Sequence, residues 1–212
     1  MRYSLIQFLR LNEELAAAFE ARHKTGVVVV GNGRSVLATE CGRAIDRFAT
    51  VVRFNEYKLD EFAPHVGSKT DLWVLSDYVC VKLLNKYPER RHPVLVAIPY
   101  MFMGKPYYHQ RRKELEQQMT PEQLGRVTFV SPDVAADLIE RHPFGDRWPS
   151  SGLLTIWHML AEHPQLYLHG FDFFREIDGK IHYMEDNHKA NHDSYTEQRI
   201  CESLGHKLMR ID

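Results

Sequence analysis

Seven short apolar runs, separated by segments with helical spacing, constrain the fold of this chain more than any other feature. The runs lie at residues 26–32, 50–55, 71–76, 93–100, 126–131, 165–171 and 206–212. Strands that alternate with helices form a parallel sheet that helices cover on both faces. We therefore predict an α/β fold: a single Rossmann-like, doubly wound, mainly parallel sheet with helices on both faces.

The length of the chain favours one domain. A chain of 212 residues, 44% of them hydrophobic, can bury one sizeable core, so we expect residues 1–212 to form a single domain. Residues 1–24 have amphipathic spacing that predicts a helix capping the core, with contact to a membrane surface or a partner as the alternative. Residues 100–125 are aromatic and then charged, which predicts either a solvated surface helix or a lid on the acceptor side of a site.

Charge and cysteine content narrow the class of protein. Lys plus Arg number 27 against 28 Asp plus Glu, so no overall charge would draw the chain to nucleic acid. The three cysteines are far apart and form no C-x-x-C pair, which argues against a disulfide framework or a zinc site. We expect a cytoplasmic protein, with peripheral contact to the inner face of the membrane as an alternative.

Two helix starts are marked by capping residues. Ser131 is followed by Pro132, which is favoured at the first position of a helix. Ser150 or Ser151 precedes an apolar run that Pro164 ends. We predict helices directly after both signals.

The Gly-Asn-Gly turn at residues 31–33 follows the first apolar run and marks a ligand site by its position, because ligands of open parallel sheets bind beyond the carboxyl ends of the strands. Val36 stands where the dinucleotide fingerprint needs a third glycine. Asn32 can donate and accept, and Ser35 can meet a phosphate at a helix start. Nucleotide binding and an ordinary β-to-α turn both remain open on these residues alone.

A second asparagine, Asn55, ends the second run at a place where dinucleotide enzymes usually carry Asp or Glu. An amide suits a ligand with a phosphate, because a carboxylate would repel it. These residues favour a phosphate-containing ligand other than a dinucleotide.

Four motifs in order resemble those of glycosyltransferase family 29, the animal and plant type sialyltransferases. They lie at residues 27–71, 149–174, 182–184 and 192–197. The first and second also resemble bacterial sialyltransferases of family 42. The cysteines that normally join the large and small motifs of family 29 are missing, which agrees with a cytosolic enzyme of bacterial type.

The resemblance implies an inverting, metal-independent transferase that moves a 2-keto sugar acid, sialic acid or Kdo, from its CMP donor to a hydroxyl of a glycan or glycolipid. No cofactor is implied, and the sequence has no Asp-x-Asp pair for a metal ion. An NAD(P)-dependent oxidoreductase and a non-catalytic CMP-sugar-binding module are the alternatives. The sequence leaves the sugar, the acceptor, the linkage and the oligomeric state open.

The resemblance also assigns roles to single residues. His192 is the expected base for the acceptor hydroxyl, His188 is its competitor, and His182 assists the departing phosphate; histidine suits a base because its ordinary pKa lies near ~6.5. The expected donor-binding residues are Gly31, Asn32, Gly33, Ser35, Asn55, Ser150, Ser151, Gly152, Tyr167, Gly170 and Asp172. Further candidates are Arg147, Tyr183 and Glu197.

Three of these assignments are more specific. Asn32 is expected to contact the CMP phosphate, and the helix start at residues 150–152 to hold the phosphate or the sugar carboxylate. Phe174 stands where family 42 has a tyrosine that serves the leaving phosphate, so that role falls to Tyr167, His182 or Arg147. Other residues of the large motif, namely Asp46, Ser68 and Asp71, are expected to shape its backbone and not to contact the donor.

Overall fold

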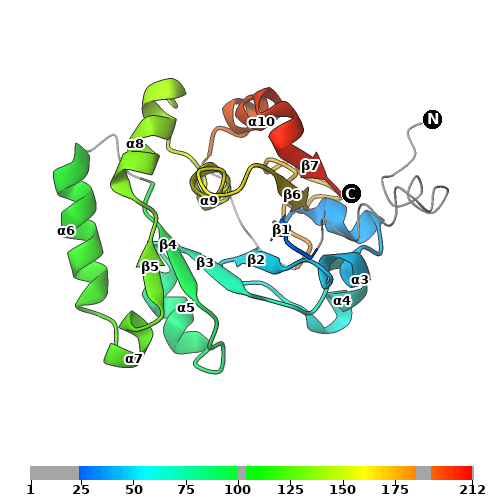
Figure 1. Ribbon diagram of the computed structural model, residues 1–212, viewed down its shortest axis with the longest axis horizontal. Coiled ribbons are helices and arrows are strands. Elements are labelled where there is room, and N and C mark those ends of the chain that lie inside the picture. Colours follow the sequence, from blue (N-terminus) through cyan, green and yellow to red (C-terminus); the bar gives the residue numbers. More distant parts are fainter. Residues whose placement is uncertain (1–23, 100–103, 185–191, 212) are drawn as a thin grey trace.

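The computed structural model describes residues 24–99, 104–184 and 192–211, which form one seven-stranded sheet. The strand order is β5-β4-β3-β2-β1-β6-β7, and every pairing is parallel (Figure 1). The strands are β1 (Val27–Val30), β2 (Thr50–Phe54), β3 (Leu72–Ser76), β4 (Val94–Ala97), β5 (Val127–Phe129), β6 (Leu166–His169) and β7 (Leu208–Arg210). The predicted α/β fold is confirmed, and the sheet is wholly, not mainly, parallel.

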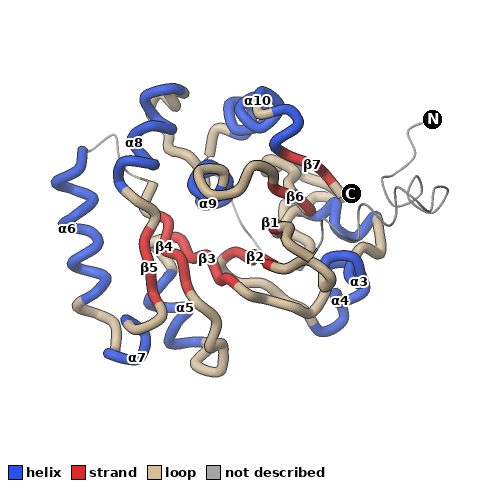
Figure 2. The backbone as a smooth tube through the Cα atoms, in the orientation of Figure 1, coloured by secondary structure: helices blue, strands red, loops and turns tan. Residues whose placement is uncertain are grey.

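Helices lie on both faces of this sheet, as Figure 1 and the tube in Figure 2 show. One face carries α3 (Gly42–Ile45), α4 (Ala63–Val66) and α5 (Cys80–Lys86). The other carries α8 (Pro132–Arg141), α9 (Ser151–Met159) and α10 (Ser194–Ser203). Beside β5 lie α6 (Gly104–Glu116) and α7 (Pro121–Leu124). Three short 3₁₀ segments complete the described part of the chain: η1 (Arg34–Ala38), η2 (Asp60–Phe62) and η4 (Gly205–Lys207).

The central strands are continuous apolar runs because they are covered from both sides. All four valines of β1 are at most 2% exposed, and all four residues of β4 are buried. β-branched residues favour this extended conformation. The sheet core therefore follows directly from the apolar runs in the sequence.

The predicted helix starts are confirmed. The Ser131 side chain accepts a hydrogen bond from the N–H of Asp133 at 3.2 Å, with Pro132 at the first helical position. The Ser150 side chain accepts from the N–H of Leu153 at 3.1 Å and caps α9. Both caps satisfy backbone donors that a helix leaves without partners.

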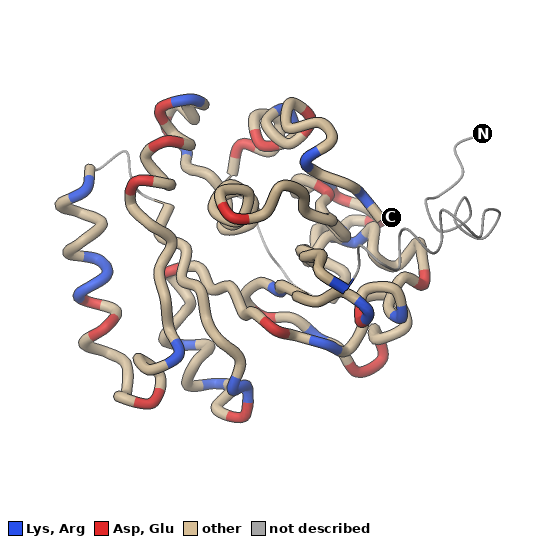
Figure 3. Tube along the Cα trace, viewed as in Figure 1, with Lys and Arg blue, Asp and Glu red and all other residues tan. Residues whose placement is uncertain are grey.

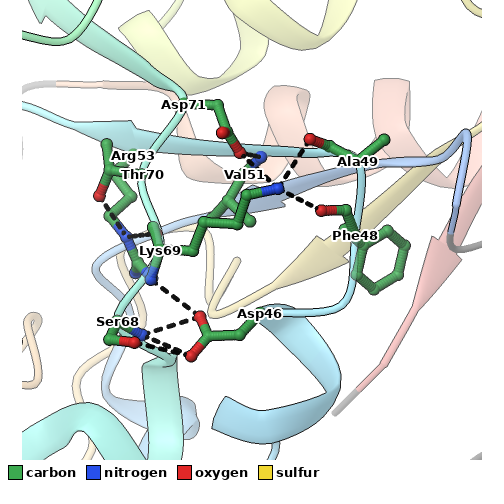
Figure 4. A network of polar contacts seen from close by, with 9 residues as sticks. All are labelled: Asp46, Phe48, Ala49, Val51, Arg53, Ser68, Lys69, Thr70 and Asp71. Carbon is green, nitrogen blue, oxygen red and sulfur yellow. Dashed lines mark hydrogen bonds and ion pairs between the residues drawn. The ribbon is translucent and has the colours of Figure 1, made fainter.

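A polar network on the loop before β3 holds the large motif together (Figure 4). The Asp46 carboxylate accepts from the N–H groups of Ser68 and Lys69, each at 2.8 Å, and from the Ser68 hydroxyl at 2.8 Å. The Asp71 carboxylate accepts from the N–H of Val51 at 2.8 Å. The expectation that Asp46, Ser68 and Asp71 shape the backbone is confirmed.

The segments at residues 1–24 and 100–125 are described only in part. Residues 1–23 lie outside the described residues, and so do residues 100–103. The rest of the segment at 100–125 forms α6 and α7, and Arg111 of α6 donates from Nε to Asp77 Oδ2 at 2.8 Å. This ion pair ties α6 to the end of β3; whether the segment closes over a site stays a prediction.

The described surface carries both signs of charge. Positions of Lys and Arg are interspersed with those of Asp and Glu over the helices (Figure 3). In the part of the chain that the structure describes, no helix has the length and apolar character needed to cross a membrane. The side chains of Cys41, Cys80 and Cys201 are all buried, and within the described residues none of them forms a disulfide.

The order of the strands defines where a ligand can bind. β1 pairs with β2 on one side and with β6 on the other, so the direction of winding reverses between β1 and β6. Such a switch point leaves a crevice at the carboxyl ends of the two strands. The turn at residues 31–33 and the loop after β6 meet there.

Candidate active site

A pocket of about 1040 Å³ opens at this crevice and extends across the carboxyl ends of β2 and β3. Most of the predicted site residues line it: Gly31, Asn32, Gly33, Asn55, Ser150, Ser151, Gly152, Gly170, Asp172, His182, His192 and Glu197. Four predicted residues do not line it: Ser35, Arg147, Tyr167 and Tyr183. His188 lies outside the described residues.

The two glycines of the Gly-Asn-Gly turn allow β1 and β6 to approach each other. The N–H of Gly31 donates to His169 O at 2.8 Å, and the N–H of Gly33 donates to Gly170 O at 2.9 Å. A Cβ atom at Gly31 would lie 2.4 Å from Gly170 O, closer than real contacts allow. Because both N–H groups already donate to the protein, these glycines build the pocket wall instead of cradling a phosphate.

The side chain of Asn32 is turned toward β2. Its Nδ2 donates to the carbonyl oxygens of Phe54 and Glu56, both at 3.2 Å, so both amide hydrogens are used. The group left for a ligand is Oδ1, an acceptor. Since an ionised phosphate also only accepts, the predicted contact between Asn32 and the phosphate does not fit this side chain, whose Oδ1 can accept only from a donor such as a hydroxyl or an amino group.

Asn55, unlike Asn32, has its amide nitrogen and not its amide oxygen available to a ligand. Its φ of 46° lies in the left-handed region, which asparagine tolerates better than most residues, and its Oδ1 accepts from the N–H of Ser76 at 2.8 Å. The backbone of Asn55 also donates to Val74 O at 2.7 Å. These bonds fix the side chain and leave Nδ2 as a donor for an anionic ligand.

Ser35 and Asp172 are used within the protein. The N–H of Ser35 donates to Asp172 Oδ2 at 2.8 Å, which ties η1 to the loop after β6. The segment at Ser35 is a short 3₁₀ helix, not an α-helix, and does not line the pocket. The prediction that Ser35 meets a phosphate at a helix start is therefore wrong.

Two predicted tyrosines have structural positions. Tyr167 lies in the middle of β6, is 4% exposed, and its ring centroid lies 4.9 Å from that of Phe48. The Tyr183 hydroxyl accepts from the N–H of Lys58 at 2.9 Å and donates to Lys58 O at 2.7 Å. Burial raises the pKa of Tyr183. The prediction of Tyr167 as a donor-binding residue is wrong because its ring points into the core, and Tyr183 holds the third motif in place.

The start of α9 provides a site for an anion. Ser151 and Gly152, in the first turn of this helix, line the pocket. Backbone N–H groups in a first turn have no partner inside the helix and carry partial positive charge. A phosphate or a carboxylate fits such a position without a metal ion.

Ser150 is held by Glu197. One carboxylate oxygen of Glu197 accepts from the N–H of Ser150 at 2.6 Å, and the other accepts from its hydroxyl at 2.7 Å. Burial raises the pKa of Glu197, which is 3% exposed, to about 7, although the bonds from Ser150 oppose this shift. Glu197 therefore joins α10 to the cap of α9, and Ser150 supports the site without offering its hydroxyl to a ligand.

The imidazole of His192 is oriented by its surroundings. Its Nδ1 lies 3.3 Å from Trp148 O, so the neutral ring carries its proton on Nδ1 and presents Nε2 as the basic nitrogen. Arg147 donates from Nη1 to His192 O at 2.8 Å, which positions the segment without entering the pocket. Helix α10 begins two residues later, at Ser194, with Asp193 as its cap.

Backbone contacts with the turn at residues 31–33 hold His182 at the pocket. Its backbone forms an isolated antiparallel bridge with Gly33, and the next residue, Tyr183, donates from its N–H to Asn32 O at 3.0 Å. The third motif is therefore docked on the first, and His182 and His192 line the same pocket.

The sequence interpretation missed several lining residues. They are Lys58, Tyr78, Lys82, Lys86, Trp148, Phe171, Phe173 and Phe174, among others. Lys58 and Tyr78 follow the ends of β2 and β3, so the rule that sites lie at carboxyl ends of strands would have found them. The phenylalanines belong to the loop after β6, where residue type gives no such signal.

Metal-binding residues do not cluster in the described part of the chain. In residues 24–99, 104–184 and 192–211, no group of three His, Cys, Asp or Glu side chains is placed to hold a metal ion. The metal-independent reaction stays a prediction, and chelation of metal ions with EDTA would test it.

Comparison with known proteins assigns this chain to a family. A family model described as glycosyltransferase family 29 (sialyltransferase) matches residues 3–208. The chain belongs to glycosyltransferase family 29. The resemblance that the motifs indicated is thereby confirmed.

Known sialyltransferases share segments or the fold with this chain. A lactosylceramide alpha-2,3-sialyltransferase of Rattus norvegicus is 36% identical over 52 residues, which make up 24% of this chain and only 13% of that protein. Two crystal structures of a mammalian sialyltransferase, one in complex with Gal-beta-1-3GalNAc-ortho-nitrophenol, each match with a TM-score of 0.63 and 20% identity. Each match covers 88% of this chain and 68% of the other, and shows that the fold is shared.

Proposed function

We propose that this chain transfers sialic acid from CMP-sialic acid to a hydroxyl of a glycan or glycolipid, with inversion and without a metal ion. The observation that carries the proposal is one pocket in which the start of α9 can hold an anion while His192 presents a basic nitrogen. Membership of family 29 supports the same chemistry.

The charges in the pocket suit a donor with two negative groups. The lining carboxylates already have partners in the protein: Glu56 binds Lys86 at 2.5 Å, Asp77 binds Arg111, and Asp172 and Glu197 accept from Ser35 and Ser150. Among the described residues, Lys58 and Lys82 line the pocket without a side-chain ion pair. CMP-sialic acid brings one phosphate and one carboxylate, and the two lysines offer matching charge.

The reaction follows from these positions. His192 Nε2 takes the proton of the acceptor hydroxyl as the acceptor oxygen forms a bond to the anomeric carbon of the sugar. The bond from that carbon to the phosphate oxygen breaks, and CMP leaves with the electron pair. N–H groups of Ser151 and Gly152, together with His182 of the same pocket, stabilise the charge on the departing phosphate. Attack opposite the leaving group inverts the anomeric centre.

The substitution Asn55→Asp tests the donor site with almost no change in shape. Aspartate keeps an oxygen to accept from the N–H of Ser76 and tolerates a positive φ, but it replaces the Nδ2 donor with a negative oxygen. We expect the Kd for CMP to rise about 10- to 100-fold, measured by isothermal titration calorimetry, because a charge-assisted bond is lost and repulsion is added. Asn85→Asp on α5, outside the pocket, is the control, and an unchanged Kd in N55D would contradict the assignment.

The sugar and the acceptor are narrower proposals. The family description names sialic acid, which favours it over Kdo. The rat relative is named for lactosylceramide, and one matched structure holds Gal-beta-1-3GalNAc. Since both of these acceptors end in galactose, we propose a glycan or glycolipid with terminal galactose as the acceptor.

Release of CMP tests the whole proposal. The assay supplies CMP-sialic acid and CMP-Kdo side by side, with lactose-based and Gal-beta-1-3GalNAc-based acceptors, in the presence and absence of EDTA. We expect acceptor-dependent release from CMP-sialic acid at a rate that EDTA does not change. Binding of CMP without turnover would favour the non-catalytic alternative, and loss of activity with EDTA would overturn the metal-independent mechanism.

A further inference from the structure

The loop after β6 contains two adjacent phenylalanines in a backbone conformation that disfavours them. Phe173 and Phe174 have φ values of 51° and 59°, in the left-handed region. Residues other than glycine, asparagine and aspartate rarely adopt this conformation, because Cβ approaches the following carbonyl oxygen. Strained residues of this kind persist only where their surroundings fix them, and they cluster at functional sites.

The chain before these phenylalanines is anchored from several sides. The Asp172 carboxylate accepts from the N–H of Ser35, and Arg210 donates from Nη1 to Phe171 O at 3.1 Å. The ring of Phe171 meets that of Phe54 edge-on, with centroids 6.0 Å apart. The loop therefore leaves β6 in a fixed direction, and the strained turn sends Phe174 to the pocket wall.

The ring of Phe174 stacks on the imidazole of His192. Their centroids lie 4.9 Å apart and the two planes differ by 30°. The contact between Nδ1 and Trp148 O directs the imidazole within its plane, and the stack with Phe174 fixes the plane itself. Together the two contacts determine where Nε2 points.

We propose that Phe174 is a positioning residue for His192. Its ring holds the imidazole face so that Nε2 meets the acceptor hydroxyl, and it stabilises the imidazolium that forms when His192 takes the proton. This inference rests on the proposed function. The charged groups on the segments around the stack are Arg147, Asp172, Arg175, Asp193 and Glu197. Substitution of Phe174 leaves the charge of each of them unchanged.

Variants of Phe174 that keep or remove the aromatic ring, while keeping an apolar side chain of similar size, test the proposal. Phe174→Leu keeps an apolar side chain without a ring, and we expect kcat to fall about tenfold while the Kd for CMP stays unchanged. Phe174→Tyr keeps the ring and is expected to retain the wild-type kcat. Phe174→Met is a second replacement without a ring, for use if the leucine variant fails to fold. Tyr195→Leu, at an exposed tyrosine outside this pocket, is the matched control.

A double substitution decides whether Phe174 acts through His192. In a His192→Ala background, Phe174→Leu should cause no further loss of kcat, because the group that it positions is absent. A tenfold loss in that background, or equal losses in kcat and CMP affinity, would overturn the positioning role. If His192→Ala itself keeps full turnover, the proposed base is wrong, and that outcome is distinct from a failure of Phe174→Leu to change kcat.

Discussion

Replacing His192 with alanine is expected to lower kcat for sialyl transfer about 10³-fold and to leave the Kd for CMP nearly unchanged. The acceptor hydroxyl is a weak nucleophile until a base takes its proton. The contact of Nδ1 with Trp148 O leaves Nε2 of His192 as a basic atom in the pocket. In the proposed donor site CMP binds to other groups, at Asn55 and at the start of α9, so we expect its affinity not to depend on this imidazole. Initial rates of CMP release and calorimetric titration with CMP measure the two quantities.

Three further histidine variants make this result specific. His206→Ala, at an exposed histidine of η4, controls for the general effect of losing an imidazole. His188→Ala tests the competing base that the motif spacing left open. His182→Ala is expected to lower kcat less than His192→Ala, because its proposed role is at the leaving group. If the His188 variant loses turnover while the His192 variant keeps it, the base assignment moves to His188.

The fold was predictable because its signals are local. Each strand is an apolar run, and Ser131 and Ser150 mark helix starts by a residue type that caps helices. The placement of the site was also predictable, since parallel strands end at the same edge of the sheet. Asn55, Ser151 and His192 line one pocket although they come from three separate motifs.

The use of each polar atom was not predictable, because it depends on partners far away in the sequence. Asn32 donates both amide hydrogens to carbonyl oxygens 22 and 24 residues away in the sequence. The N–H of Ser35 donates to the carboxylate of Asp172, 137 residues away. Tyr167 is a strand residue whose ring packs against Phe48 in the core, and the side of the sheet that it occupies was not evident from the sequence. The left-handed φ of Phe174 could not be predicted either, because phenylalanine is not a residue type that favours this conformation.

The stability of the protein is expected to depend on pH through Glu197. Burial raises the pKa of this carboxyl from 4.5 to about 7 in the folded protein. Below pH 4.5 the carboxyl is protonated in both the folded and the unfolded chain, so no stability is lost through its ionisation. As the pH rises toward 7, the unfolded chain ionises first, and unfolding becomes more favourable. The loss amounts to about 3 kcal/mol once the pH passes the folded-state pKa.

The substitution Glu197→Gln removes this titration while keeping a polar side chain of the same shape. We expect the free energy of unfolding of the wild type, relative to that of E197Q, to fall by most of this amount between pH 5 and pH 8. Urea denaturation at the two values measures it. Glu202→Gln, at an exposed position on the same helix, should keep the wild-type pH dependence, and parallel curves for the wild type and E197Q would contradict the raised pKa. The neutral carboxyl can keep both links to Ser150, with one oxygen accepting from the N–H and the O–H donating to Oγ, so the raised pKa is compatible with the contacts between Glu197 and the cap of α9.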